Sequence, residues 1–242
     1  MMNSGSVFAV IPAYNAADTL ADVVGRLRAS LPGVTVVIVD DGSTDDTAVE
    51  AERLDVLLLR HPRNRGKGAA LKTGFKAALA QGAKVVLTLD ADGQHEPDEA
   101  VKLLKALDER ALDVALGSRM HDLRRMPVHR ILSNTITSRL ISWRLGVRIS
   151  DSQSGFRAMR REVLEKMELV TDRFETESEL LLRAGLAGFE IGAVSVKTIY
   201  PKQGRSAMRA VDIYRFIALF LKSLTWRKNP AAHTKTWTTI SE

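Results

Sequence analysis

The chain has 242 residues, of which 45% are hydrophobic and 26% are charged, a composition typical of a globular protein with a full core. It contains no cysteine, which excludes a disulfide scaffold, a thiolate zinc site and a cysteine nucleophile. Lys and Arg number 35 against 29 Asp and Glu, and the net charge of +6 favours an anionic partner such as a nucleotide, a nucleic acid or a lipid surface.

We see no signal peptide, because residues 1–6 form a short polar leader that runs straight into an apolar stretch. A membrane-spanning helix needs roughly 20 apolar residues, and residues 216–221 are the nearest approach to one. We therefore expect a cytoplasmic protein, either soluble or in peripheral contact with the inner face of the membrane.

Strand and helix patterns alternate through the first half of the chain. Apolar runs predict strands at residues 7–11, 34–39, 56–59, 85–89 and 114–117. Helical spacing and capping residues predict helices at 18–30, 44–53, 68–80 and 97–107. This alternation with short connections predicts an α/β fold, with a mainly parallel sheet and helices on both faces.

The pattern changes after residue 119. We expect an arginine-rich loop leading into a helix over residues 121–150, a helix over 174–187 and a strand over 190–198. A polar loop at 201–206 precedes an amphipathic helix at about 208–226, and a polar tail at 227–242 is expected to be disordered. No linker is visible, so we predict one domain over residues 1–226, with a nucleotide-binding half at about 7–119 and an acceptor half at about 120–226.

Two carboxylates, Asp90 and Asp92, follow the apolar run at residues 85–89. In an open α/β sheet, ligands bind at the carboxyl ends of the strands. Paired carboxylates at that position favour a hard divalent cation. A solvated loop that caps a helix would show the same spacing, and on spacing alone the two interpretations are equal.

Polar residues also follow the first two predicted strands. Tyr14 can lay its ring against a nucleobase, and a carboxylate such as Asp40 or Asp41 can accept hydrogen bonds from a base or a ribose. Taken alone, the segment 40–43 is more typical of a turn with a helix N-cap. Because neighbouring parallel strands end at one edge of the sheet, the strand ends together favour a ligand crevice.

Four motifs occur in the order seen in family 2 glycosyltransferases: Ile11-Pro12-Ala13-Tyr14-Asn15, Val39-Asp40-Asp41-Gly42-Ser43-Thr44-Asp45, Asn64-Arg65-Gly66-Lys67-Gly68-Ala69-Ala70 and Asp90-Ala91-Asp92-Gly93-Gln94-His95. Two further motifs, Gly117-Ser118-Arg119 and Asp151-Ser152-Gln153-Ser154-Gly155-Phe156-Arg157, strengthen the match. Over about residues 7–206, the chain most resembles the dolichyl/polyprenyl-phosphate mannose and glucose synthase branch of that family.

The resemblance implies a glycosyltransferase A-type fold, which is Rossmann-like, and a set of binding residues. Residues implied to hold the nucleotide sugar are Pro12, Ala13, Tyr14, Asp40, Asp41, Lys67, Gly68, Asp90 and Ala91. Residues implied to bind Mg²⁺ or Mn²⁺ on the donor diphosphate are Asp90, Asp92 and Gln94. Those implied to meet an acceptor phosphate are Arg119, Arg130 and Ser133.

The implied reaction is an inverting transfer of a hexose from a nucleoside-diphosphate sugar to a polyprenyl phosphate. Asp92, Arg119, Arg205 and Glu177 are the candidate catalytic residues. Arg205 resembles an arginine that closes over the donor phosphates, although Ala207 stands where relatives usually have a basic residue. A divalent ion with Arg205 would stabilise the charge that builds on the leaving diphosphate.

An acceptor phosphate is already an anion near neutral pH, so it needs positioning by arginine and not a strong base. The alternative acceptor is a hydroxyl of a saccharide or other small molecule, which would need Glu177 as a base. Acidic residues are also typical of a helix N-terminus, which is the structural interpretation of Glu177. A non-catalytic nucleic-acid-binding protein would need stacking aromatics on a basic face, but aromatic residues are only 5% of this chain, so we expect no nucleic-acid partner.

Arginines at positions 119, 124, 125, 130, 139, 144 and 148 form a basic region beyond the predicted sheet. This region could be a solvated helix face or a surface that meets lipid phosphate, and the residues favour neither. The helix at 208–226 mixes apolar and basic residues, so it could lie in a membrane interface or pack on the core or on a second copy in a homodimer.

Overall fold

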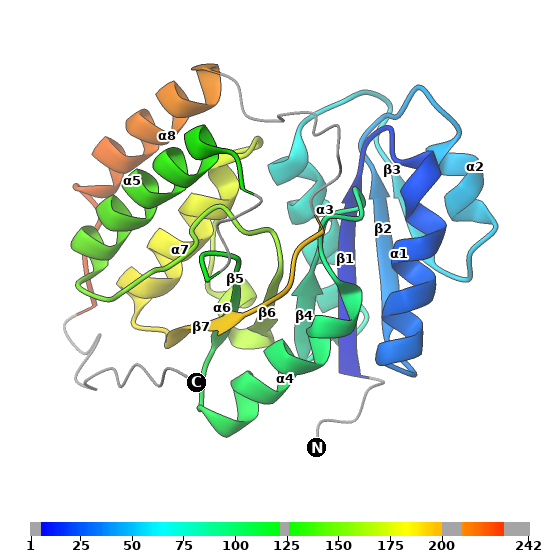
Figure 1. Ribbon diagram of the computed structural model, residues 1–242, viewed down its shortest axis with the longest axis horizontal. Helices are drawn as coiled ribbons and strands as arrows, with labels where there is room; N and C mark the ends of the chain where they lie inside the picture. The colour runs from blue at the N-terminus through cyan, green and yellow to red at the C-terminus, as the bar shows by residue number, and fades with distance from the viewer. Residues whose placement is uncertain (1–5, 122–125, 200–209, 230–242) are drawn as a thin grey trace.

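The computed structural model describes residues 6–121, 126–199 and 210–229, which form one sheet covered by helices on both faces (Figure 1). The strands are β1 (Val7–Ala13), β2 (Thr35–Asp40), β3 (Leu57–Arg60), β4 (Val85–Thr88), β5 (Val114–Ser118), β6 (Arg157–Arg160) and β7 (Ile191–Ser195). The helices are α1 (Ala17–Ser30), α2 (Thr47–Glu52), α3 (Lys67–Ala80), the 3₁₀ turn η2 (Pro97–Glu99), α4 (Ala100–Glu109), α5 (Val128–Leu145), α6 (Arg161–Glu165), α7 (Glu175–Ala187) and α8 (Ala210–Ser223).

The sheet has the strand order β3-β2-β1-β4-β6-β5-β7. All neighbours pair in parallel except β6, which is antiparallel to β4 on one side and to β5 on the other. The predicted α/β fold with a mainly parallel sheet is therefore confirmed. The sequence does not predict β6, because its Arg-Ala-Met-Arg segment lacks the apolar run that marks the other strands.

Two apolar clusters lie on opposite faces of the sheet. Successive residues of β1 alternate between them, with Val10 in one cluster and Ile11 in the other. Helices α3, α5, α6, α7 and α8 contribute to the first cluster, whereas α1, α2 and α4 contribute to the second. This double burial explains why the central strands are continuous apolar runs.

The strand order reverses beside β1. The chain first builds outward through β2 and β3, and then crosses to the other side of β1 to place β4. The crevice at the carboxyl ends of β1 and β4 is the position where open α/β sheets bind ligands. The residues after β1, β2 and β4 therefore lie at one edge, as the strand-end motifs predict.

Within the described ranges, no helix is long and apolar enough to cross a membrane. The predicted amphipathic helix is present as α8, between residues 210 and 223. The start of the predicted tail is anchored to the fold, because Lys228 Nζ donates to the Leu145 carbonyl at 3.0 Å and Asn229 N donates to the Leu186 carbonyl at 2.8 Å. Arg124, Arg125, Arg205, the loop at 201–206 and the tail from residue 230 lie outside the described residues.

Candidate active site

Asp40 closes β2 at the crevice edge and is fully buried. Its Oδ1 accepts a hydrogen bond from the Ser43 amide at 2.9 Å, and its Oδ2 lies 3.1 Å from Nε of Arg60. Asp40 therefore stabilises the backbone just after β2, whereas the predicted helix N-cap is not at this segment, because α2 begins at Thr47. The nucleotide-binding role of Asp40 stays a prediction.

Asp41 organises the loop that leads into α3. Its Oδ1 accepts from the Arg65 amide at 3.0 Å and lies 2.7 Å from Nδ1 of His61, and its Oδ2 accepts from the Gly66 amide at 2.7 Å. Gly66 has a φ of 109°, a conformation that side chains rarely adopt. Asp41 therefore shapes the start of α3, where Lys67 and Gly68 lie.

Tyr14 follows β1 with its side chain 48% exposed, although aromatic rings are usually buried. The next residue, Asn15, has a positive φ of 51°, and its Oδ1 accepts from the Thr44 amide at 2.9 Å. This link joins the β1 and β2 strand ends and holds the backbone beside the ring. Of the two preceding residues, Ala13 is buried and Pro12 is partly buried, so both lie beneath the exposed part of this strand end.

The acidic pair lies directly after β4. Asp90 Oδ1 is 2.6 Å from Nζ of Lys67, and its Oδ2 is 3.5 Å from Nε2 of the buried His95. Asp92 accepts from the Gln94 amide N–H at 3.0 Å and from Gln94 Nε2 at 2.7 Å. The three predicted metal ligands are therefore neighbours, with a cationic ammonium already on Asp90.

The electrostatics of this pair suit a cation. Burial alone would raise the pKa of Asp90, but the charge of Lys67 and the contact with His95 hold that pKa well below its ordinary range. The pKa of Asp92 is raised, first by desolvation and then by the charge of Asp90. A divalent ion would relieve this repulsion.

The side-chain atoms of Asp90, Asp92 and Gln94 are of the kind that a hard metal ion binds. Two carboxylates and the oxygen of the Gln94 amide are oxygen ligands of the kind that Mg²⁺ and Mn²⁺ prefer. In the described part of the chain, no three His, Asp or Glu side chains are grouped so as to hold an ion by themselves. Such a site is typical of an ion that is shared with a bound diphosphate.

Glu177 lies in the first turn of α7, and its Oε1 is 2.8 Å from Nζ of Lys67. Burial would lower the pKa of Lys67, but the charges of Asp90 and Glu177 raise it above its ordinary value. Gly155 passes directly beside this ion pair, because a Cβ at that position would lie 2.8 Å from Asp90 Oδ1 and 2.9 Å from Lys67 Nζ. Lys67 therefore links α3, β4 and α7 at the acidic pair.

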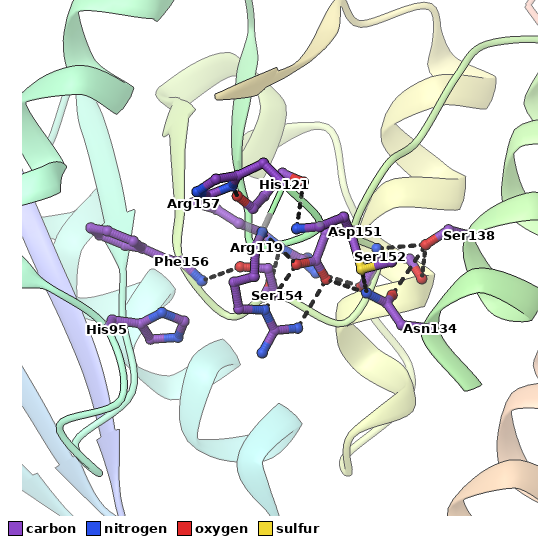
Figure 2. Close-up of polar contacts among 12 residues, drawn as sticks. His95, Arg119, His121, Asn134, Ser138, Asp151, Ser152, Ser154, Phe156 and Arg157 are labelled. Atoms are coloured by element: carbon purple, nitrogen blue, oxygen red, sulfur yellow. Dashed lines mark hydrogen bonds and ion pairs between the residues drawn. The ribbon is translucent and has the colours of Figure 1, made fainter. Parts of the chain in front are cut away.

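Arg119, after β5, is held by a buried carboxylate (Figure 2). Asp151 accepts from Arg119 N at 3.0 Å, Nε at 2.8 Å and Nη2 at 2.9 Å, and from Nδ2 of Asn134 at 2.8 Å. Burial would raise the pKa of Asp151, but the bonds and charge of Arg119 lower it. We call these three residues the Asp151 clamp. It sets the position of an arginine predicted to meet the acceptor.

The other two predicted acceptor residues lie on α5. Ser133 Oγ accepts from Nε2 of Gln153 at 2.9 Å, and Arg130 lies one turn earlier on the same helix, half-buried. Ser138, one turn after Asn134 on α5, donates to Ser152 Oγ at 3.0 Å. The motif at 151–157 thus binds the polar side of α5, which brings Arg119, Arg130 and Ser133 to one region. Their contact with an acceptor stays a prediction.

The sequence indicates no particular role for Asp151, Asn134 or Arg157. The Arg157 side chain is buried, and it donates to the carbonyls of Ser154 at 2.8 Å, Ser152 at 3.0 Å and Glu177 at 2.8 Å. Burial lowers its pKa, partly offset by the charge of Glu177. The motif containing Asp151 and Arg157 was visible in the sequence, but nothing in it indicated which partners they bind.

The same fold is present in solved glycosyltransferases. The structure of glucosyl-3-phosphoglycerate synthase from Mycobacterium tuberculosis, in complex with UDP, matches with a TM-score of 0.69 at 22% identity, and the match covers 90% of this chain and 79% of that one. The fold is therefore the glycosyltransferase A-type fold that the family resemblance implies.

The model of the family described as glycosyl transferase family 2 matches residues 8–168. The chain belongs to this family and is a glycosyltransferase. It is 35% identical over 216 residues to polyprenol monophosphomannose synthase from Mycolicibacterium smegmatis, with 84% of this chain and 81% of the relative covered. It is 32% identical over 240 residues to UDP-N-acetylglucosamine–dolichyl-phosphate N-acetylglucosaminyltransferase from Methanococcus voltae, with 88% and 95% covered.

Proposed function

We propose that the protein transfers a hexose, with inversion and with Mg²⁺ or Mn²⁺, from a nucleoside-diphosphate sugar to a polyprenyl phosphate. The observation that carries the proposal is the acidic pair Asp90 and Asp92 at the β1/β4 crevice, with Lys67 against it. The two relatives described above carry a polyprenol and a dolichyl phosphate in their names, which supports a lipid phosphate as the acceptor.

The donor would lie along the carboxyl ends of β1, β2 and β4. The exposed ring of Tyr14 offers a stacking surface for the base, and Asp40 offers a carboxylate to base or ribose. The remaining residues that we propose contact the donor are Pro12, Ala13, Asp41, Gly68 and Ala91.

Asp90, Asp92 and Gln94 would hold the divalent ion on the donor diphosphate. When bound, such an ion neutralises negative charge on the leaving diphosphate. A glucosyl-3-phosphoglycerate synthase with this fold has been solved with Mn²⁺ and UDP, which supports this assignment. Lys67 lies against Asp90 and supplies a second, fixed positive charge beside the same region.

The acceptor phosphate would be positioned by Arg119, Arg130 and Ser133. Because a phosphate is already anionic near neutral pH, the chain has to hold and orient it and need not remove a proton. The Asp151 clamp limits the motion of Arg119, so the entropy lost on binding is small. Arg205, outside the described residues, would close over the donor phosphates.

A hydroxyl acceptor with Glu177 as base is the alternative. Oε1 of Glu177 lies 2.8 Å from Nζ of Lys67, so a substrate hydroxyl would compete with the Lys67 ammonium for that oxygen. This contact supports a phosphate acceptor over a hydroxyl one.

A lipid acceptor would bring the protein to a membrane surface. We propose peripheral contact at the cytoplasmic face of the membrane that includes residues 208–226, where soluble nucleotide sugars can reach the site.

The test is incubation of the protein with UDP- and GDP-sugars, Mg²⁺ or Mn²⁺, and undecaprenyl phosphate, with product measured by mass spectrometry. We expect metal-dependent formation of a polyprenyl-phosphate sugar, and its loss in Asp92→Asn. The matched control is Asp98→Asn, an exposed carboxylate on η2 that pairs with Arg26 and not with the acidic pair. Failure to consume any donor, or full activity in Asp92→Asn, would contradict the proposal, and transfer to saccharides alone would favour the alternative.

A further inference from the structure

Lys67 carries an ammonium that is shared by two carboxylates from different parts of the fold. Its Nζ lies 2.6 Å from Oδ1 of Asp90, after β4, and 2.8 Å from Oε1 of Glu177, in the first turn of α7. The Lys67 and Glu177 side chains are 16% and 8% exposed, so water solvates neither charge well. Asp90 is also a proposed ligand of the divalent ion, and Lys67 and that ion would therefore compete for it.

This competition has an electrostatic cost. Two cations on one carboxylate repel each other, and the repulsion is stronger where water is scarce. Asp90 is therefore fully available to a divalent ion only if the Lys67 ammonium gives up its share of the carboxylate. A buried ammonium that loses its partner is strongly destabilising. Metal binding would carry that cost unless a second carboxylate kept the ammonium.

Glu177 is in the position of such a second carboxylate, and the backbone fixes its distance from Lys67. The starts of α3 and α7 are in close contact beside this ion pair. A Cβ on Gly68 would overlap Oγ1 of Thr176 and would lie 2.7 Å from the carbonyl carbon of Asp172. A glycine at position 68 thus lets the first turn of α3 approach the first turn of α7, and this approach brings Lys67 to Glu177.

The surroundings leave the ammonium few other places. Within the described residues, Lys67 is the only cationic side chain at ion-pair distance from the Glu177 carboxylate. The nearby Arg157 guanidinium donates to the Glu177 carbonyl at 2.8 Å and to two other backbone carbonyls. On another side the Gly155 backbone approaches the ion pair, since a Cβ there would lie 2.9 Å from Nζ. An ammonium that leaves Asp90 therefore has Glu177 as its remaining partner.

We propose that Glu177 is a positioning residue that acts through Lys67 and sets the affinity of the acidic pair for the divalent ion. This inference rests on the metal assignment in the proposed function. Without metal, Asp90 and Glu177 share the ammonium. When Asp90 is given to the ion, Glu177 keeps the ammonium, and the cost of an unpaired buried charge is avoided. Lys67 then stays beside the donor diphosphate as a positive charge.

The test is Mn²⁺ binding to the full chain without nucleotide, measured by electron paramagnetic resonance of free Mn²⁺. Glu177→Gln should weaken Mn²⁺ binding about 10- to 100-fold, the range typical for residues that support a metal ligand. The matched control is Asp172→Asn, which removes the carboxylate that lies 2.7 Å from another α3 ammonium, that of Lys72. This control makes the same change in net charge and should bind Mn²⁺ like the unmodified protein.

A double-mutant cycle tests whether Glu177 acts through Lys67. In Lys67→Met no ammonium competes for Asp90, so Glu177→Gln should lower the Mn²⁺ affinity in that background by less than about threefold. An equal loss in both backgrounds would mean that Glu177 attracts or binds the ion directly, and would overturn the proposal. Unchanged Mn²⁺ affinity together with lost sugar transfer in Glu177→Gln would place Glu177 on the substrate and would also overturn it.

A second measurement needs no substitution, because Lys67→Met leaves two buried carboxylates without their cation. A crystal structure of the unmodified protein with Mn²⁺ should show Nζ of Lys67 on Glu177 and no longer on Asp90. An ammonium that stays on Asp90 would overturn the proposal. If Glu177→Gln weakens Mn²⁺ binding but the unmodified protein transfers no sugar to a polyprenyl phosphate, the proposed function fails and the role of Glu177 stands.

Discussion

The Asp151→Asn substitution tests the buried Asp151 clamp. The carboxylate is fully buried and accepts three hydrogen bonds from Arg119 and one from Asn134, all between 2.8 and 3.0 Å. An asparagine side chain keeps the shape of the carboxylate but removes its negative charge. Its NH₂ group would face the N–H donors of Arg119 or Asn134. Breaking one side of a buried ion pair costs about 3–5 kcal/mol. Because the Arg119 side chain is 16% exposed, we expect the low end, about 3 kcal/mol.

The assay is unfolding by urea, with the free energy of unfolding compared between variants. A loss of about 3 kcal/mol is a large part of the roughly 5–15 kcal/mol that stabilises a typical domain. The matched control is Asp108→Asn, whose pair with Arg160 at 3.1 Å is solvent-exposed, with 45% and 32% of the two side chains accessible. That loss should stay below about 1 kcal/mol. Equal losses in the two variants would refute the reasoning.

The pH dependence gives a second readout of the same variant. The pKa of Asp151 is lowered in the folded protein, so its contribution to stability is present above the unfolded pKa of about 3.9 and is lost as the pH falls below it. The stability difference between the unmodified protein and Asp151→Asn should therefore be constant near neutral pH and shrink as the pH falls below about 4. A difference that stays unchanged in acid would show that the carboxylate charge is not its source.

Three other substitutions test separate parts of the site. Arg157→Met removes the donor from three carbonyls and should lower the free energy of unfolding by about 3 kcal/mol, since each unpaired buried acceptor costs about 1–3 kcal/mol; a urea midpoint equal to that of the unmodified protein would argue against it. Gly155→Ala places a Cβ 2.8 Å from the Asp90 carboxylate and should weaken Mn²⁺ binding in calorimetry by about tenfold or more while the far-UV spectrum is unchanged. Unaltered Mn²⁺ affinity would contradict the metal assignment. Thr73→Val removes the hydroxyl that lies 2.9 Å from His61 Nε2 and should cost about 1–3 kcal/mol in thermal unfolding; no change would mean that water replaces it.

The order of the strands and helices up to β5, and the edge where the strand-end motifs meet, can be predicted from the sequence. Long apolar runs such as those of β1, β2 and β4 are buried on both faces, so their composition alone marks them as strands. Parallel strands then end at one edge, whatever the details of packing. That rule places Tyr14, Asp40 and Asp90 together, as the structure has them.

The partners of the charged residues cannot be predicted in this way, because they follow from the packing of distant segments. The antiparallel strand β6 passes between β4 and β5, and this brings Asp151 to Arg119 and Gly155 to Asp90. Lys67 reaches Glu177 across 110 positions of the chain. Local sequence carries no signal for such pairs, because they depend on how distant elements pack and not on spacing within a helix or strand.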